Sequence, residues 1–133
     1  MAKVYIADLE DAALDWAVAT AEGYQAVYTN GSITPVFKPR EPVVALNTLR
    51  YSSDRSLSGR IIERELIWTR PTEDETDPNR QWRAEKPRTA VQFGATPLIA
   101  CMRCFVAMRS KEDWIDIPDE LIETTKYTES QRG

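Results

Sequence analysis

The stretch Thr96-Pro97-Leu98-Ile99-Ala100-Cys101-Met102-Arg103-Cys104-Phe105-Val106-Ala107-Met108 decides the fold. Thr96 and Pro97 predict the start of a helix, because threonine is a good N-cap and proline fits the first helical position. Residues 98–108 are apolar around nearly the whole circumference of that helix, apart from Arg103. A helix that is apolar on all sides is normally buried, so we expect this one to lie deep in the core.

A second helix is predicted over residues 8–21. Asp8 is the expected N-cap, and Gly23 is expected to end the helix. The apolar residues of this segment recur at helical spacing: Leu9, Ala13, Trp16 and Ala17.

The remaining apolar segments are short and predict strands. They comprise residues 25–28, 33–37, 66–69, 81–84, 89–93 and 115–117. Residues 51–59 and the acidic segment 72–79 are interpreted as loops. Residues 61–68 fit either a strand or a short helix, and a short ordered segment that runs into the strand at 66–69 is favoured. The predicted fold class is α+β, with a small antiparallel sheet of four or five strands and two main helices packed on one face. Residues 1–123 are expected to form a single domain and residues 124–133 a flexible C-terminal tail.

The composition excludes several kinds of chemistry. The chain has 133 residues, no histidine, and 17 basic against 21 acidic residues, which gives a net charge of −4. Without histidine there is no Ser-His-Asp or Cys-His catalysis and no histidine-ligated zinc. Cys101 and Cys104 lie inside a predicted helix and are interpreted as core residues, with redox chemistry as the alternative. We therefore expect no metal and no other cofactor.

The charge and hydropathy also constrain the partners. The acidic balance argues against sequence-independent duplex binding, so we expect no direct nucleic-acid binding. No apolar run approaches the ~20 residues that span a bilayer, so no membrane partner is expected. The N-terminal residues include Asp8, Glu10 and Asp11 where a secretory signal would be apolar, which indicates a cytoplasmic protein. The oligomeric state stays open, a homo-oligomer included.

Arg103 is the most informative single residue, because an unpaired charge inside an apolar helix is costly. Its guanidinium has to meet a carboxylate, reach solvent or face a cavity. The candidate carboxylates are Asp15, Glu63 and Glu65. A structural ion pair and a contact to a ligand are both open interpretations.

A ligand site is predicted at the turn Gly94-Ala95-Thr96-Pro97, because N–H groups at a helix start can bind an anion. Thr96 offers a hydroxyl group to such a ligand. The candidates for added positive charge are Arg60, Arg64 and Arg103. The candidates for stacking on a ring are Trp16 and Tyr51. The simpler interpretation is that Thr96 only caps the helix.

Ser52, Asp54 and Glu63 complete the candidate ligand-binding residues. Ser52 and Asp54 place a hydroxyl and a carboxylate close together. No histidine or lysine lies nearby to activate a serine, so nucleophilic catalysis is not expected. A turn organised by these side chains is the structural alternative.

Three segments carry a family resemblance. Residues 11–19 read DAALDWAVA, residues 51–65 contain YSSD and GRIIERE, and residues 94–107 read GATPLIACMRCFVA. In this order they resemble the NinX family of small phage and prophage accessory proteins, whose motifs are GAALDWAVA, YSPSTDWAQGGPIIERE and GPTPLIAAMRCYVA. Arg55 and Arg60 depart from the middle motif, where the family has Trp and Pro. The resemblance implies a phage origin and a host-cytoplasm setting, and it supplies no reaction.

Together these observations favour a non-catalytic phage accessory protein that acts by binding in the host cytoplasm. It would be a counter-defence protein that sequesters a small, anionic, nucleotide-like signalling ligand or blocks a host protein. One alternative is a small hydrolase or transferase that uses Glu63, Glu65 or Asp54 on a nucleotide. Another is a recombination accessory protein that acts through protein contacts.

Overall fold

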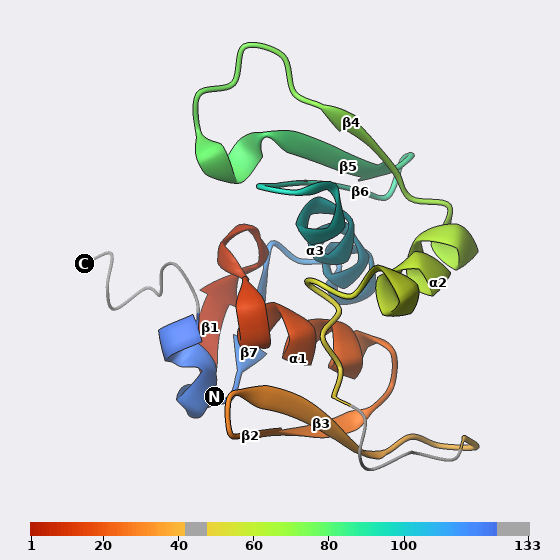
Figure 1. Cartoon of the computed structure of the whole chain (residues 1–133), viewed down its shortest axis with the longest axis vertical. Coiled ribbons are helices and arrows are strands. Elements are labelled where there is room, and N and C mark those ends of the chain that lie inside the picture. The colour runs from red at the N-terminus through yellow and green to blue at the C-terminus, as the bar shows by residue number, and fades with distance from the viewer. Residues whose placement is uncertain (42–47, 125–133) are drawn as a thin grey trace.

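Helix α3 (Pro97–Ser110) lies at the centre of the molecule, with elements packed around it on several sides (Figure 1). The computed structural model describes residues 1–41 and 48–124. The other helices are α1 (Asp11–Ala21) and α2 (Arg55–Glu65), and short 3₁₀ turns are η1 (Ile6–Asp8), η2 (Pro78–Arg80) and η3 (Asp119–Thr124). The strands are β1 (Ala2–Tyr5), β2 (Gln25–Thr29), β3 (Ser32–Phe37), β4 (Trp68–Pro71), β5 (Trp82–Lys86), β6 (Ala90–Gly94) and β7 (Trp114–Ile117).

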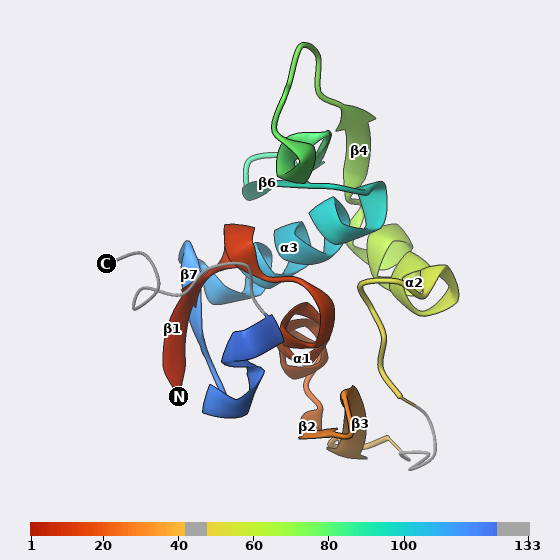
Figure 2. The same ribbon diagram turned by 60° about the vertical axis from the view of Figure 1, so that its left-hand side comes forward.

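The fold class is α+β, as predicted, but the described strands form three small antiparallel sheets and not one sheet of four or five strands. Strand β1 pairs with β7, β2 pairs with β3, and β4, β5 and β6 form a meander. The meander packs on one side of α3, while α1 lies on another side (Figure 2). A helix that is apolar all round needs cover from several directions, and no single sheet face supplies that.

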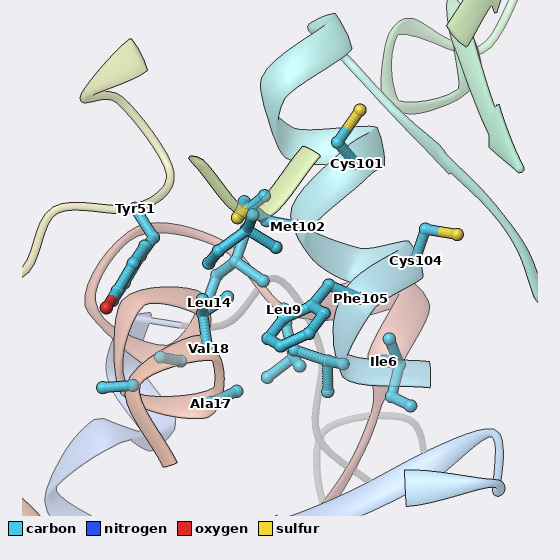
Figure 3. Packing of buried hydrophobic residues seen from close by; sticks show 14 of the residues in the cluster. Ile6, Leu9, Leu14, Ala17, Val18, Tyr51, Cys101, Met102, Cys104 and Phe105 are labelled. Atoms are coloured by element: carbon cyan, nitrogen blue, oxygen red, sulfur yellow. The ribbon is translucent and has the colours of Figure 1, made fainter. Parts of the chain in front are cut away.

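The core lies mainly between α1 and α3. Leu14 and Val18 of α1 pack with Met102 and Phe105 of α3, all fully buried, and Leu9 enters from the segment before α1 (Figure 3). The prediction that α3 is deeply buried is confirmed. Thr96 caps this helix as predicted, since its side-chain oxygen accepts a hydrogen bond of 3.1 Å from the Ile99 N–H.

The predicted start of α1 was wrong. Asp8 does not cap the helix: it lies in η1, and α1 begins at Asp11 after the extended residue Glu10. The chain turns first at η1 because its Ile6 side chain is buried in the core, which separates that turn from the helix. The predicted end is confirmed, since Gly23 has a φ of +97°, a conformation that glycine adopts at little cost.

The first half of helix α2 was not predicted, because residues 51–59 were interpreted as a loop, and its second half was only the alternative interpretation of residues 61–68. Its start is fixed by Asp54, whose carboxylate accepts hydrogen bonds from the N–H groups of Ser56 (2.9 Å) and Leu57 (3.3 Å). Serine and glycine have low helix propensity, so the sequence pattern hides this helix. Leu66 ends it with a φ of 57°, and the strand predicted at residues 66–69 begins at Trp68.

The other predicted strands are confirmed within a residue or two. No helix in residues 1–41 and 48–124 is long and apolar enough to cross a membrane. Of the predicted tail, residues 125–133 lie outside the described part of the chain.

Candidate functional site

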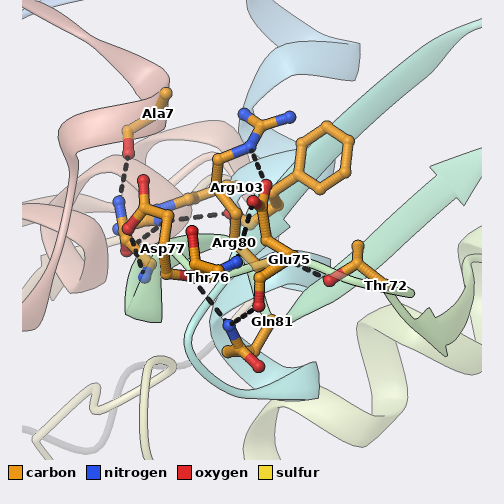
Figure 4. Close-up of polar contacts among 10 residues, drawn as sticks. Ala7, Thr72, Glu75, Thr76, Asp77, Arg80, Gln81 and Arg103 are labelled. Atoms are coloured by element: carbon orange, nitrogen blue, oxygen red, sulfur yellow. Dashed lines mark hydrogen bonds and ion pairs between the residues drawn. The ribbon is translucent and has the colours of Figure 1, made fainter.

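The buried Arg103 side chain links separate segments of the chain through hydrogen bonds, and its guanidinium does not pair with the predicted carboxylates. Its side chain is 1% exposed, and its Nε donates to the Leu9 carbonyl at 2.9 Å. Its Nη1 donates to the Phe93 carbonyl at 2.8 Å and to the Asn79 Oδ1 at 3.0 Å, beside the loop drawn in Figure 4. The expectation that Asp15, Glu63 or Glu65 binds this guanidinium was wrong. Arg103 instead donates to two main-chain carbonyls and one amide oxygen, so its buried guanidinium is largely satisfied without a carboxylate.

Burial has a measurable consequence for this guanidinium. It lowers the pKa of Arg103 to about 10, because the charged form loses solvation that its partners do not fully replace. Its Nη2 is buried and has no hydrogen-bond partner among the described residues. The three hydrogen bonds of the other guanidinium nitrogens join α3 to η2, to β6 and to the segment before α1.

Asp15 holds the segment that leads into α2. Its side chain is 7% exposed, and its Oδ1 accepts a hydrogen bond of 2.7 Å from the Ser52 N–H. Burial raises the pKa of Asp15 to about 6, although the hydrogen bond from Ser52 opposes the shift. Next to it, the Ser58 hydroxyl donates to the Tyr51 carbonyl. The Tyr51 ring is buried in the core, so it is not placed to stack on a ligand.

Arg64 belongs to an ion-pair cluster that joins all three helices. Its Nη1 donates to Glu22 at 3.1 Å, and its Nε donates to Glu65 at 2.7 Å. Arg109 lies 3.6 Å from the same Glu65 carboxylate, and both arginines lie against the Phe105 ring. The Arg64 guanidinium lowers the pKa of Glu65. These charges hold the C-terminal ends of the helices together, away from the predicted ligand site.

A cavity of about 500 Å³ lies where α2 and α3 begin, beside β4. Figure 2 shows α2 and β4 next to the N-terminal end of α3. Three elements and the segment before α2 supply the lining residues, which are Ser52, Ser53, Arg55, Gly59, Ile62, Thr69, Thr96, Pro97, Leu98, Ile99 and Cys101.

The chemistry of this lining favours an anion. Arg55 supplies a positive charge, and Ser52, Thr69 and Thr96 supply hydroxyl groups. None of the described lining residues is acidic, although the whole chain has a net charge of −4. The beginning of α3 faces this region with the partial positive charge of its helix dipole, while the Asp54 carboxylate already caps the beginning of α2. Ile62 and Leu98 add an apolar wall that suits the body of a small molecule.

Two of the nine predicted site residues, Ser52 and Thr96, line this cavity. The others are placed elsewhere: Asp54 caps α2, Arg60 and Glu63 are exposed on α2 outside the lining, and Tyr51, Arg64 and Arg103 make the contacts described above. Trp16 lies in a separate groove of about 190 Å³ between α1, α3 and β7.

The sequence interpretation missed Arg55, Thr69 and Ile62. Arg55 and Ile62 are brought to the cavity by α2, which was not predicted as a helix. The signal that would have found Arg55 is the Asp54 cap directly before it.

Fold and cavity together define a class: a small α+β protein that has no histidine and that has a cavity of mixed polar and apolar lining where two helices begin. The chain belongs to the NinX family, since the family described as "Bacteriophage P22, NinX" matches residues 5–109. It is a phage accessory protein. A comparison with curated proteins found no match.

Proposed function

We propose that this phage protein acts without catalysis, by binding a small anionic ligand in the cavity between α2, β4 and α3. The observation that carries the proposal is the cavity of about 500 Å³ with Arg55 and several hydroxyl groups in its lining and no described carboxylate. Cationic and hydroxyl donors are the groups that bind phosphate and carboxylate oxygens. The ligand is therefore a phosphate-bearing or carboxylate-bearing molecule with an apolar or ring portion against Ile62 and Leu98.

For a phage accessory protein, the consequence of such binding is sequestration of the small anionic ligand. A protein that holds an anionic, nucleotide-like signalling molecule in the host cytoplasm lowers its free concentration and counters a host defence that depends on it. Blocking a host protein is the second route by which such a protein would act, and it does not require the cavity.

The enzymatic alternative receives no support from the geometry. Asp54 is used as a helix cap, Glu65 is held by Arg64 and Arg109, and Glu63 is exposed outside the cavity lining. A general acid or base works best with a pKa near the operating pH, whereas the pKa of Glu65 is lowered.

Isothermal titration calorimetry with inorganic phosphate, AMP and a cyclic dinucleotide tests the proposal. We expect at least one of these probes to bind, and Arg55→Gln to weaken that binding by about tenfold or more, because a charge-assisted hydrogen bond is lost. Arg60→Gln is the matched control, since Arg60 is an exposed arginine of the same helix outside the cavity lining. Absence of binding by all three probes, or equal losses in the two variants, would overturn the proposal.

A further inference from the structure

The outer face of the β4–β5–β6 sheet carries a separate group of side chains that neither the fold nor the cavity explains. Ala84 of β5 is fully buried against α3, so its neighbours Arg83 and Glu85 face the opposite side of the sheet. The strand register then places two rows on that outer face: Arg70, Arg83 and Phe93 in one row, and Trp68, Glu85 and Val91 in the next. Thr69, which lines the cavity, points to the other face of β4.

One charge on this face, that of Arg70, is not paired with an acidic residue among those that the structure describes. Arg70 lies directly opposite Arg83, and like charges in that position destabilise a sheet. The Arg83 Nη2 meets Glu85 at 2.6 Å, but Arg70 forms no ion pair with any residue that the structure describes. An anionic partner that reaches both guanidinium groups would remove this repulsion.

Aromatic rings accompany the arginines. The Arg80 guanidinium lies 3.8 Å from the centroid of the Phe93 ring, and Glu75 fixes it there through an Nε–Oε1 bond of 2.9 Å (Figure 4). The Arg70 guanidinium lies 5.6 Å from the centroid of the Trp68 ring, which is 37% exposed. Strand spacing puts Trp68 and Phe93 about 12 Å apart, on the two outer strands of the sheet.

At the β6 edge the face ends in a hollow of about 340 Å³. Val91 and Phe93 line it from the sheet, Arg80 lines it from η2, and Asp113 also contributes to its wall. A hollow of this kind next to a ring and a flat guanidinium can accept a planar group, with the carboxylate of Asp113 as an acceptor for its N–H donors.

We infer that this outer face binds single-stranded nucleic acid. Bases stack on Trp68 and on the Arg80–Phe93 pair, and Arg70 and Arg83 contact the phosphates. The exposed Trp68 ring and the half-buried Phe93 ring lie among cations on a sheet, and rings and cations arranged in this way bind unpaired bases, whereas a paired duplex hides its ring faces. The net charge of −4 argues against duplex binding, but it does not measure a local stacking surface, so this inference departs from the expectation of no direct nucleic-acid contact.

Fluorescence anisotropy with a labelled oligo(dT) of about 15 nucleotides tests the inference. We expect Trp68→Ala to weaken binding by about fivefold or more, and Trp68→Phe to restore much of the loss because a ring is kept. Arg70→Gln should reduce the slope of log affinity against log salt by roughly 0.7, the value for one phosphate contact on a single strand. Val36→Ala, on an exposed position of β3, should change nothing, and Arg55→Gln should leave oligo(dT) binding intact while it affects the cavity.

Several outcomes would overturn the inference. They are no oligo(dT) binding at about 100 μM protein, equal or tighter binding of a blunt duplex, and an affinity unaffected by Trp68→Ala in a protein whose melting temperature is unchanged. Displacement of the oligonucleotide by polyglutamate with equal potency would assign the face to an acidic protein segment instead.

Discussion

Helix α3 is buried through its centre, from Ala100 to Val106, whereas α2 lies at the surface and buries Ser58 and Ile61. The two helices begin at the same cavity, but different interactions hold them. Burial of apolar side chains stabilises α3, and contacts at its ends and flanks stabilise α2: the Asp54 cap, the Asp15–Ser52 bond and the Arg64 ion pairs. The comparison teaches that substitutions in the α3 region should mainly change stability, while substitutions in α2 should mainly change ligand binding.

The largest effect is expected at Arg103. Arg103→Met keeps the volume but leaves the carbonyls of Leu9 and Phe93 without their donor, so the free energy of unfolding should fall by about 3–5 kcal/mol. Urea denaturation measures this loss. Arg109→Met is the control within the same helix, since its partly exposed ion pair contributes at most about 1 kcal/mol. Equal losses in the two variants would contradict the role of Arg103 as a buried tie.

Substitutions at two glycines, one packed against α3 and one inside α2, test the difference between the two helices. A Cβ atom at Gly94 would lie 2.6 Å from the Ala100 backbone nitrogen, so Gly94→Ala should cost about 2–3 kcal/mol of stability. A Cβ atom at Gly59, inside α2, would meet no atom within 4 Å, so Gly59→Ala should stabilise the protein by about 0.5–1 kcal/mol. Thermal unfolding checks both. The comparison fails if the two substitutions change the melting temperature in the same direction.

The buried Asp15 carboxylate, which holds the segment before α2, makes the free energy of unfolding depend on pH. Its pKa is raised from 3.8 to about 6 in the folded protein, so the folded state binds a proton more readily than the unfolded chain. Above pH 6 the buried carboxylate therefore opposes folding, and this opposition declines as the pH falls from about 6 to about 4. Asp15→Asn keeps an acceptor for the Ser52 N–H without the charge, and should be more stable than the wild type by about 1–2 kcal/mol at pH 7.

The measurement is the difference in unfolding free energy between Asp15→Asn and the wild type at several pH values. That difference should shrink as the pH approaches 4. A difference that is constant from pH 4 to 7 would mean that Asp15 titrates as it does in the unfolded chain.

A smaller loss of stability than at Arg103 or Gly94 is expected at Asp54. Asp54→Ala removes the acceptor for two N–H groups at the start of α2 and should cost about 1 kcal/mol. Because the start of α2 carries Arg55 into the cavity, binding of the phosphate probes should weaken as well. Asp54→Asn retains a good cap and serves as the control. If Asp54→Ala lowers stability but leaves binding of the phosphate probes unchanged, the cap does not position Arg55 in the cavity and this prediction is wrong.

Much of the fold was predictable because local signals and burial agree. The Thr96-Pro97 start of α3, the Gly23 end of α1 and the short strands from β2 to β7 were indicated by the sequence, whereas β1 was not predicted. The α2 helix was hidden, since two of its stabilising contacts come from Asp15 and Glu22, residues distant in the sequence. The same reason explains the site: Ser52 and Thr96 were predicted, but Arg55 and Thr69 reach the cavity only through α2 and the strand after it.

By itself, the sequence determined that the protein is α+β, that its central helix is buried, that histidine-based chemistry is absent, and which family it resembles. These properties follow from composition, spacing and local capping, which act over a few residues. Only the tertiary structure decided that Arg103 meets carbonyls and not carboxylates, that the strands divide into three sheets among the described residues, and that Arg55 faces a cavity. Those outcomes depend on which distant groups packing brings within hydrogen-bond distance, and spacing along the chain does not encode that.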